Sequence, residues 1–221
     1  MIGTETVFED RVKAGRLLGQ ELARLNLARP AVFGVPRGGV VVAREVAVAL
    51  GAPLCVWPVR KLGAPGNPEF GFGAIAPGDI IEVESETAAA LGLGAEEIEK
   101  VAAAERAELV RRMEAYGFNQ SVKAVRGEFD AAIIVDDGLA TGGTAKAAIA
   151  SVRRFFPGVE VVLAAPVAAA ETILVMEKLA DRVVVLTAPH GLGAVGSWYR
   201  FFPQITDAEV KEVLKSSGAG K

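Results

Sequence analysis

Five short apolar segments alternate along this chain with segments whose apolar residues recur at helical spacing. The segments at 31–35 and 131–136 are almost wholly apolar, and a helical pattern follows each of them. Strands that are apolar on both sides belong in a parallel sheet with helices on both faces. We therefore predict a three-layer α/β/α fold with a mainly parallel sheet. The predicted strands are 31–35, 53–59, 131–136, 159–167 and 182–188.

Helical patterns fill the spaces between these strands. In residues 7–25, Phe8 and Leu22 fall on the same face, as in an amphipathic helix. Gly51 ends the pattern at 40–50 in the manner of a helix C-cap. Further helices are predicted at 94–116, 143–155, 171–180 and 207–215.

The stretch between the second and third strands departs from this alternation. Residues 62–93 are rich in glycine and proline, and we expect most of them to form a mobile loop. Within it, the segment GAIAPGDIIEV predicts a β-hairpin that turns at Pro77–Gly78 and adds an antiparallel edge strand. Together with the charged helix that follows, this loop forms an insertion at about 62–128 in a single domain of residues 1–221. The candidate hinges of the loop are Gly66, Gly71 and Gly73.

Charge and rare residues narrow the classes of function. The chain has 24 basic and 27 acidic residues. The resulting net charge of −3 argues against a protein that binds the nucleic-acid backbone over an extended surface. The single Cys55 excludes an internal disulfide, and one histidine, His190, disfavours a Cys/His zinc site. The longest apolar run is too short to span a bilayer, and the N-terminus lacks the pattern of a secretory signal. We therefore expect a cytoplasmic protein without a membrane partner.

The segment AAIIVDDGLATGGTAKAAI, at 131–149, carries the clearest chemical pattern. An apolar strand leads into two adjacent acids, and a loop of glycines and threonines then opens a helix. Glycines leave backbone N–H groups free to converge on an anion, and the helix N-terminus adds a positive partial charge. The carboxylates of Asp136 and Asp137 suit ribose hydroxyls or a divalent cation rather than phosphate. An ordinary strand–turn–helix without a ligand is the alternative interpretation.

This segment resembles the signature of type I phosphoribosyltransferases, in which two acids precede a Thr-Gly-Gly-Thr phosphate loop. The resemblance implies binding of 5-phosphoribosyl-1-pyrophosphate (PRPP), with Asp136 and Asp137 on its ribose hydroxyls and in indirect contact with a Mg²⁺ ion. It also implies the strand order 2-1-3-4-5, which places the first and third strands side by side. By the same resemblance, the PRPP-binding residues of the loop are Gly138, Leu139, Ala140, Thr141, Gly142, Gly143 and Thr144.

A second segment, GVPRGGV at 34–40, extends the resemblance. The family has a pyrophosphate loop after its first core strand, and Arg37 with the amides of Gly38 and Gly39 would fill that role here. The resemblance also implies a non-proline cis peptide bond at Pro36–Arg37. The alternative is a simple helix-entry turn with a solvated Arg37.

A third segment, VRKLGAPG at 59–66, follows the predicted second strand. Its Arg60 and Lys61 resemble an Arg-Lys pair of orotate phosphoribosyltransferases that meets the pyrophosphate. Two basic residues exposed at a strand end are also common in proteins without such a site, so this alternative stays open.

The family further carries a small hood that recognises the acceptor base. Its counterpart here is the segment at about 189–205, together with the N-terminal helix. Trp198, Tyr199 and Phe201 are the candidate acceptor-binding residues, because each can stack on a flat ring. Core or dimer contacts are equally compatible with aromatic residues so near the C-terminus.

These segments together indicate an enzyme that transfers the phosphoribosyl group of PRPP to a nitrogenous, nucleobase-like acceptor and releases pyrophosphate. Mg²⁺ bound with PRPP is the implied cofactor, no nucleic-acid partner is expected, and a homodimer is allowed. Ala140 stands where some purine enzymes carry an acidic base, so a base would come from the loop, with Glu69 as a candidate, or from the hood, unless the acceptor needs none. The alternative function is a regulator that binds PRPP or a nucleotide without turnover. The candidate catalytic residues are Arg37, Lys61, Asp136 and Asp137.

Overall fold

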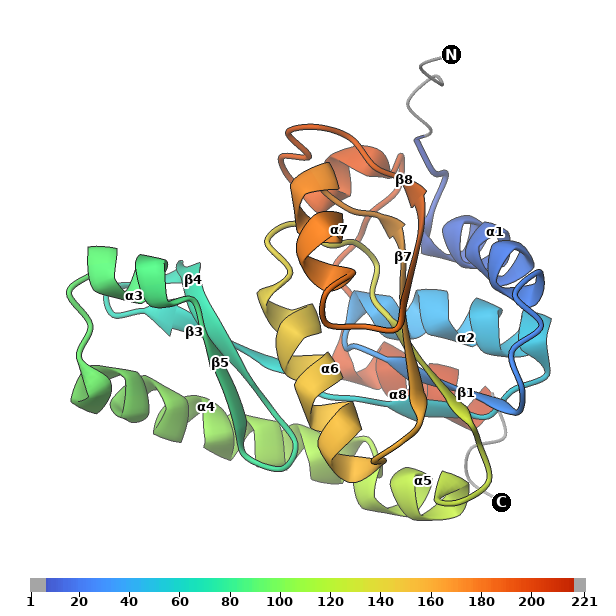
Figure 1. The fold of residues 1–221 in the computed structure, drawn as a ribbon, viewed down its shortest axis with the longest axis horizontal. Helices are drawn as coiled ribbons and strands as arrows, with labels where there is room; N and C mark the ends of the chain where they lie inside the picture. Colours follow the sequence, from blue (N-terminus) through green and yellow to red (C-terminus); the bar gives the residue numbers. More distant parts are fainter. Residues whose placement is uncertain (1–6, 217–221) are drawn as a thin grey trace.

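A parallel sheet of five strands forms the centre of the computed structural model, which describes residues 7–216 (Figure 1). The sheet order is β2-β1-β6-β7-β8, so the predicted order 2-1-3-4-5 is confirmed. Every neighbouring pair is parallel, and β1 pairs with β6 along its whole length. The strands are β1 (Pro30–Gly34), β2 (Leu54–Val56), β6 (Ala131–Val135), β7 (Glu160–Val167) and β8 (Arg182–Thr187).

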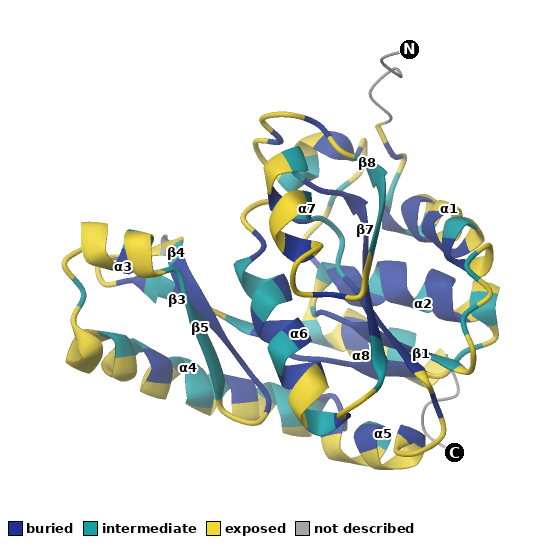
Figure 2. Cartoon of the chain, in the orientation of Figure 1, coloured by how far each residue is buried: buried dark blue, intermediate teal, exposed yellow. Residues whose placement is uncertain are grey.

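Helices cover both faces of this sheet, as the apolar strands predict. Alternate strand residues point to opposite faces, so Val32 and Ile133 pack on one side while Phe33 and Ile134 pack on the other. The buried residues of Figure 2 accordingly follow the strands and the inner sides of the helices. The first face carries α1 (Arg11–Ala23), α2 (Gly38–Leu50) and α8 (Asp207–Ser216), and the second carries α5 (Phe118–Val125), α6 (Gly143–Phe155) and α7 (Ala170–Met176).

The insertion forms a separate unit, here called the arm, that projects to one side of the parallel sheet (Figure 1). Its three strands make their own antiparallel sheet in the order β3-β4-β5. The expectation of an edge strand added to the main sheet was therefore wrong, although the hairpin turn at Pro77–Gly78 is confirmed. The arm comprises β3 (Arg60–Ala64), β4 (Asn67–Ala76), β5 (Ile80–Val83), α3 (Ser85–Ala90) and α4 (Ala95–Ala115).

The arm is ordered because it has a hydrophobic core of its own. Leu62, Phe72 and Ile75 are fully buried against Ala102 and Leu109 of α4. This packing replaces the mobile loop expected at 62–93. Gly71 and Gly73 lie within β4, where a side chain would meet Lys61 or the backbone of β5, and Gly66 is the positive-φ residue of the β3–β4 turn.

The arm is also tied to the parallel sheet at its base. The Ser151 hydroxyl of α6 donates to the Pro77 carbonyl at 2.6 Å and accepts from the Trp57 indole N–H at 3.2 Å. Trp57 lies beyond the end of β2, which stops at Val56 instead of continuing to residue 59 as expected. The chain leaves the main sheet here, and Arg60 and Lys61 begin β3 rather than ending the second core strand.

The segment predicted as the hood, residues 189–205, packs against Phe8. Phe8, Leu192, Trp198 and Tyr199 form a buried cluster, and a short 3-10 helix, η1 (Val195–Trp198), lies within this segment. Helix α1 begins later than predicted, at Arg11, because the Asp10 side chain accepts a hydrogen bond from the Lys13 N–H and caps it. None of the helices between residues 7 and 216 is both long and apolar enough to cross a membrane.

Candidate active site

The loop between β6 and α6 presents a group of backbone donors at a helix N-terminus. Within residues 7–216, the N–H groups of 141–145 donate no hydrogen bond to the rest of the chain. The first N–H of the helix that donates one is that of Lys146, to the Gly142 carbonyl. The loop itself is held in place, because the Leu139 N–H donates to the Val167 carbonyl at 2.9 Å and the Thr172 hydroxyl donates to the Ala140 carbonyl. A rigid loop with free donors at the start of a helix is suited to binding an anion.

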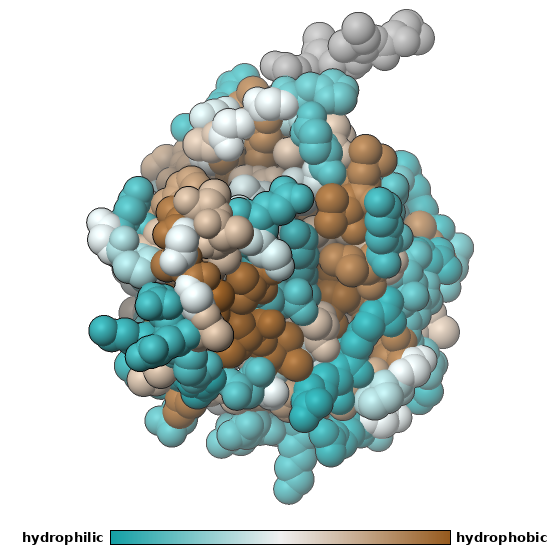
Figure 3. All heavy atoms as spheres, turned by 60° about the vertical axis from the view of Figure 1, so that its left-hand side comes forward, coloured by the Kyte–Doolittle hydropathy of each residue, from teal (hydrophilic) through white to brown (hydrophobic). Residues whose placement is uncertain are grey.

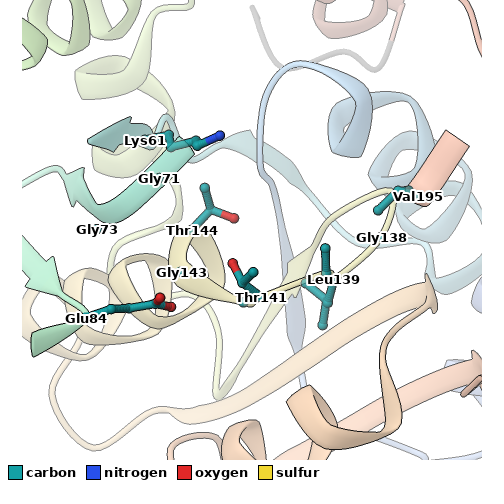
Figure 4. A pocket seen from close by; sticks show the side chains of 12 residues that line it. Lys61, Gly71, Gly73, Glu84, Gly138, Leu139, Thr141, Gly143, Thr144 and Val195 are labelled. Atoms are coloured by element: carbon teal, nitrogen blue, oxygen red, sulfur yellow. The ribbon is translucent and has the colours of Figure 1, made fainter. Parts of the chain in front are cut away.

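A cavity of about 270 Å³ lies over this loop. Lys61 and Glu84 approach it from the arm, and Thr141 and Thr144 lie on the loop side (Figure 4). The structure thus brings Lys61 together with the loop, although the two are far apart in the sequence. The lining residues that the sequence predicted as PRPP-binding or catalytic are Lys61, Gly138, Leu139, Ala140, Thr141, Gly142, Gly143 and Thr144.

The predicted pyrophosphate loop lies directly against the two acids. A Cβ atom at Gly39 would lie 2.8 Å from both the Asp136 Cα and the Val135 carbonyl oxygen, and one at Gly38 would collide with the Asp137 carboxylate. Only glycines therefore allow the N-terminus of α2 to approach β6 so closely. The cis peptide bond at Pro36–Arg37 is confirmed. These positions agree with the side-by-side loops that the strand order implies, while the binding roles of the residues stay predictions.

Arg11 of α1 is a further component of this region. Its Nε lies 2.7 Å from Asp137 Oδ2, and only 8% of the Arg11 side chain and 17% of the Asp137 side chain are exposed. Its Nη1 donates to the Pro203 carbonyl at 2.8 Å, and its guanidinium carbon lies 3.6 Å from the centre of the Phe202 ring. Arg11 and Asp137 thus form a largely buried ion pair between α1 and the end of β6.

The two neighbouring acids differ in their electrostatic environment. Burial, followed by the charge of Asp137, raises the pKa of the Asp136 carboxyl well above its usual range. Asp136 also accepts a hydrogen bond from the Asp137 N–H at 2.8 Å. Among the side chains that the structure describes, no group of three acidic, histidine or cysteine residues could hold a metal ion. Carboxylates such as those of Asp136 and Asp137 are donors that Mg²⁺ prefers, and binding of Mg²⁺ together with PRPP stays a prediction.

Replacing Asp136 with asparagine is expected to change how stability depends on pH. Because the native pKa is raised, the unfolded chain releases the Asp136 proton at a lower pH than the folded protein does. The free energy of unfolding therefore falls as pH rises from about 4 to the native pKa. The decrease is at most about 1.4 kcal/mol per pH unit. Asp136→Asn removes this contribution and keeps the acceptor for the Asp137 N–H. Urea unfolding from pH 5 upward should therefore show a stability difference in favour of the variant that grows with pH until the native pKa of Asp136 is reached.

Asp130→Asn is the matched control. The side-chain hydrogen bond from Arg29 lowers the pKa of the exposed Asp130, so its stabilisation is complete above about pH 4 and is lost only as pH falls further. The difference between Asp130→Asn and wild type should thus be flat from pH 5 to 8. A flat difference for Asp136→Asn as well would show that Asp136 is ionised in the folded protein.

Several predicted site residues lie outside the cavity. Arg60 is paired with Glu105 at 2.7 Å, and Arg37 lies 3.9 Å from Asp207 with its side chain 38% exposed. Trp198 and Tyr199 are buried: the Trp198 N–H donates to the Leu192 carbonyl, and the Tyr199 hydroxyl donates to the Asp137 carbonyl at 2.5 Å. Phe201 is exposed, and the side chain of Glu69, the candidate base, lies outside the described part of the structure.

Four residues near the site were missed by sequence reasoning. Arg11 carried one usable signal, because it lies on the same helical face as the buried Leu18 and Leu22. Glu84 lines the cavity and lies 3.6 Å from the Lys146 amine, and Val195 of η1 closes the cavity near Gly138. No sequence motif identifies these three residues. Glu84 approaches the loop from the arm, Lys146 from α6 and Val195 from the hood segment, so their positions depend on the folded structure.

Comparisons with known proteins agree with this architecture. The family model for the phosphoribosyl transferase domain matches residues 10–196. In Mycobacterium tuberculosis H37Rv, the protein named "Putative phosphoribosyl transferase Rv0571c" is 42% identical over 208 residues, which make up 94% of this chain and 46% of that protein. The chain thus spans about half the length of the curated relatives it matches. The crystal structure of TT1426 from Thermus thermophilus is 39% identical, with a TM-score of 0.73 over 96% of this chain and 99% of that one.

Proposed function

Because this chain belongs to the phosphoribosyl transferase domain family, we propose that it transfers the phosphoribosyl group of Mg²⁺-bound PRPP to a flat, nitrogenous acceptor. One observation carries the proposal: a cavity in which unpaired amides at the α6 N-terminus face Lys61 of the arm. Amides and an ammonium group complement a phosphate monoester, and the acids needed for an attached ribose follow β6 directly.

In this reaction the bond from the anomeric carbon to the pyrophosphate oxygen breaks, and its electrons leave with the pyrophosphate. A bond to the acceptor nitrogen forms at the same carbon, and the proton of that nitrogen passes to a base, for which Glu69 is the candidate, or to water. The amides of 141–145 donate hydrogen bonds to the 5-phosphate, and the Asp137 carboxylate accepts a hydrogen bond from a ribose hydroxyl. Arg37 and the amides of Gly38 and Gly39 stabilise the charge of the departing pyrophosphate, which Mg²⁺ accompanies.

Exposed hydrophobic surface near the cavity supports a flat acceptor. Phe70 is 50% exposed and precedes Gly71, which lines the cavity. The arm side of the molecule presents hydrophobic surface among hydrophilic side chains (Figure 3). Trp198 and Tyr199 are buried, whereas Phe70 and Phe201 expose their rings and are free of that restriction on stacking.

The proposal predicts pyrophosphate release from Mg²⁺·PRPP that depends on one member of a panel of nucleobases and related amines. Lys61→Ala should weaken PRPP binding about tenfold, because removing a charged hydrogen-bond donor costs about 1.5–3 kcal/mol and this side chain is largely exposed. Lys100→Ala, an exposed lysine elsewhere on the arm, is the matched control and should bind as the wild type does. Calorimetry with Mg²⁺·PRPP measures the affinities.

The outcomes separate the two candidate functions. Release of pyrophosphate with one acceptor establishes a transferase. PRPP binding without release from any acceptor would instead favour a regulator that senses PRPP. If neither PRPP nor inorganic phosphate binds, the cavity is not an anion site and both functions are wrong.

A further inference from the structure

Arg11 joins three parts of the molecule that are distant in the sequence. It starts at the N-terminus of α1, reaches Asp137 after β6, and contacts Pro203 and Phe202 of the hood. Each polar contact is short, at 2.7 Å to the Asp137 carboxylate and 2.8 Å to the Pro203 carbonyl. A guanidinium is a rigid planar fork, so two such contacts fix its orientation together with that of its partners.

These contacts restrain Asp137 from both ends. The guanidinium holds Oδ2 of the carboxylate, while the Tyr199 hydroxyl donates to the backbone carbonyl of the same residue. Asp137 is thereby tied to the hood twice, once through Arg11 and once through Tyr199. A carboxylate with one oxygen engaged by a cation can still accept hydrogen bonds, since its two oxygens offer about four lone-pair sites.

We propose that Arg11 is a positioning residue that fixes the Asp137 carboxylate as the acceptor for a ribose hydroxyl and couples it to the hood. The inference rests on the proposed function only in taking Asp137 as a ribose contact. Arg11 does not touch the phosphate loop, and it is not among the residues that line the cavity over it. Its effect should therefore be confined to ligands that carry a ribose.

Two probes isolate this effect. Inorganic phosphate reports on the loop alone, and ribose 5-phosphate adds the ribose hydroxyls without pyrophosphate. We expect the wild type to prefer ribose 5-phosphate by about tenfold, as one charge-assisted hydrogen bond can supply. Arg11→Gln should lose most of this preference, while its affinity for inorganic phosphate stays within about twofold of the wild type.

Two further variants of α1 serve as controls. Arg16→Gln changes an exposed arginine of the same helix that pairs with Glu45, and it should keep the full preference. Arg11→Lys retains the buried cation but not the planar fork, so its preference should lie between those of the wild type and Arg11→Gln. If Arg11→Gln does not fold, Arg11→Lys decides the question.

The result that overturns the inference is a preference for ribose 5-phosphate that is the same in the wild type and in every folded Arg11 variant. A wild type that binds both probes equally would overturn it as well, because Asp137 would then make no ribose contact. The proposed transfer reaction fails by a different result, namely that Mg²⁺·PRPP releases no pyrophosphate with any acceptor. The two failures are therefore distinguishable.

Discussion

Replacing Gly39 with alanine is expected to lower the free energy of unfolding by about 2 kcal/mol and to weaken Mg²⁺·PRPP binding at least tenfold. The added Cβ would lie 2.8 Å from two backbone atoms of the β6 end, the Asp136 Cα and the Val135 carbonyl oxygen. Backbone atoms of a central strand cannot rotate away as a side chain can, so α2 must move. Overpacking of this kind costs up to about 3 kcal/mol, and the better helix propensity of alanine returns up to about 1 kcal/mol.

Gly143→Ala is the matched control for this prediction. Gly143 is the first residue of α6, as Gly39 lies in the first turn of α2, yet a Cβ there would meet no atom closer than 3.9 Å. Urea unfolding should therefore show unchanged or slightly increased stability for Gly143→Ala and a clear loss for Gly39→Ala. Equal stabilities for the two variants would mean that α2 does not pack on β6 as closely as described.

The main sheet was predictable because its signals are local. A strand such as AAIIV in β6 is apolar at every position, and its burial on both faces follows from that pattern alone. The GLATGGT loop was also recognisable from the sequence. Glycines and threonines that directly precede a helix are typical of a phosphate-binding loop, and this pattern needs no tertiary information. The strand order was predicted from the family resemblance that this loop carries, and the loop side of the cavity from the residues of the loop itself.

The arm was wrongly predicted to be a mobile loop, because its strand signals are weak and the contacts that stabilise it are not local. In β3 and β4, Gly63, Gly71 and Gly73 interrupt the alternation that marks a strand, so the region resembles a loop. A Cβ at Gly63 or Gly73 would lie 2.4 Å from a backbone oxygen, and one at Gly71 would collide with the Lys61 side chain. Leu62 and Phe72 of the same strands pack on α4, which is distant in the sequence. The distance between Lys61 and the phosphate loop depends on this packing.

Arg11 shows the same limit at the scale of one residue. A charged residue in an amphipathic helix is usually solvated, and nothing near Arg11 in the sequence identifies a partner 126 positions away. Its place on the apolar face of α1 is a local sign of burial, but the identity of Asp137 as its partner follows from the packing of α1 against α2, β7 and β8. Buried ion pairs between distant segments are thus beyond what a single sequence can supply.

Replacing Asp137 with asparagine is expected to have the largest effect on stability. The change leaves the Arg11 guanidinium buried without its counter-charge, which costs about 3–5 kcal/mol when one partner of a buried pair is removed. Binding of Mg²⁺·PRPP should fall as well, because an amide is a weaker acceptor for a ribose hydroxyl than a carboxylate. Urea unfolding and calorimetry measure the two effects separately.

The double variant Arg11→Gln with Asp137→Asn separates stability from binding. It removes both charges, and its two neutral amides can hydrogen-bond each other, so stability should recover to within about 1 kcal/mol of the wild type. Binding of Mg²⁺·PRPP should stay as weak as in Asp137→Asn, because the anionic acceptor is still missing. Recovery of binding together with stability would mean that Asp137 serves only to neutralise Arg11, and the ribose contact would then have to come from another residue.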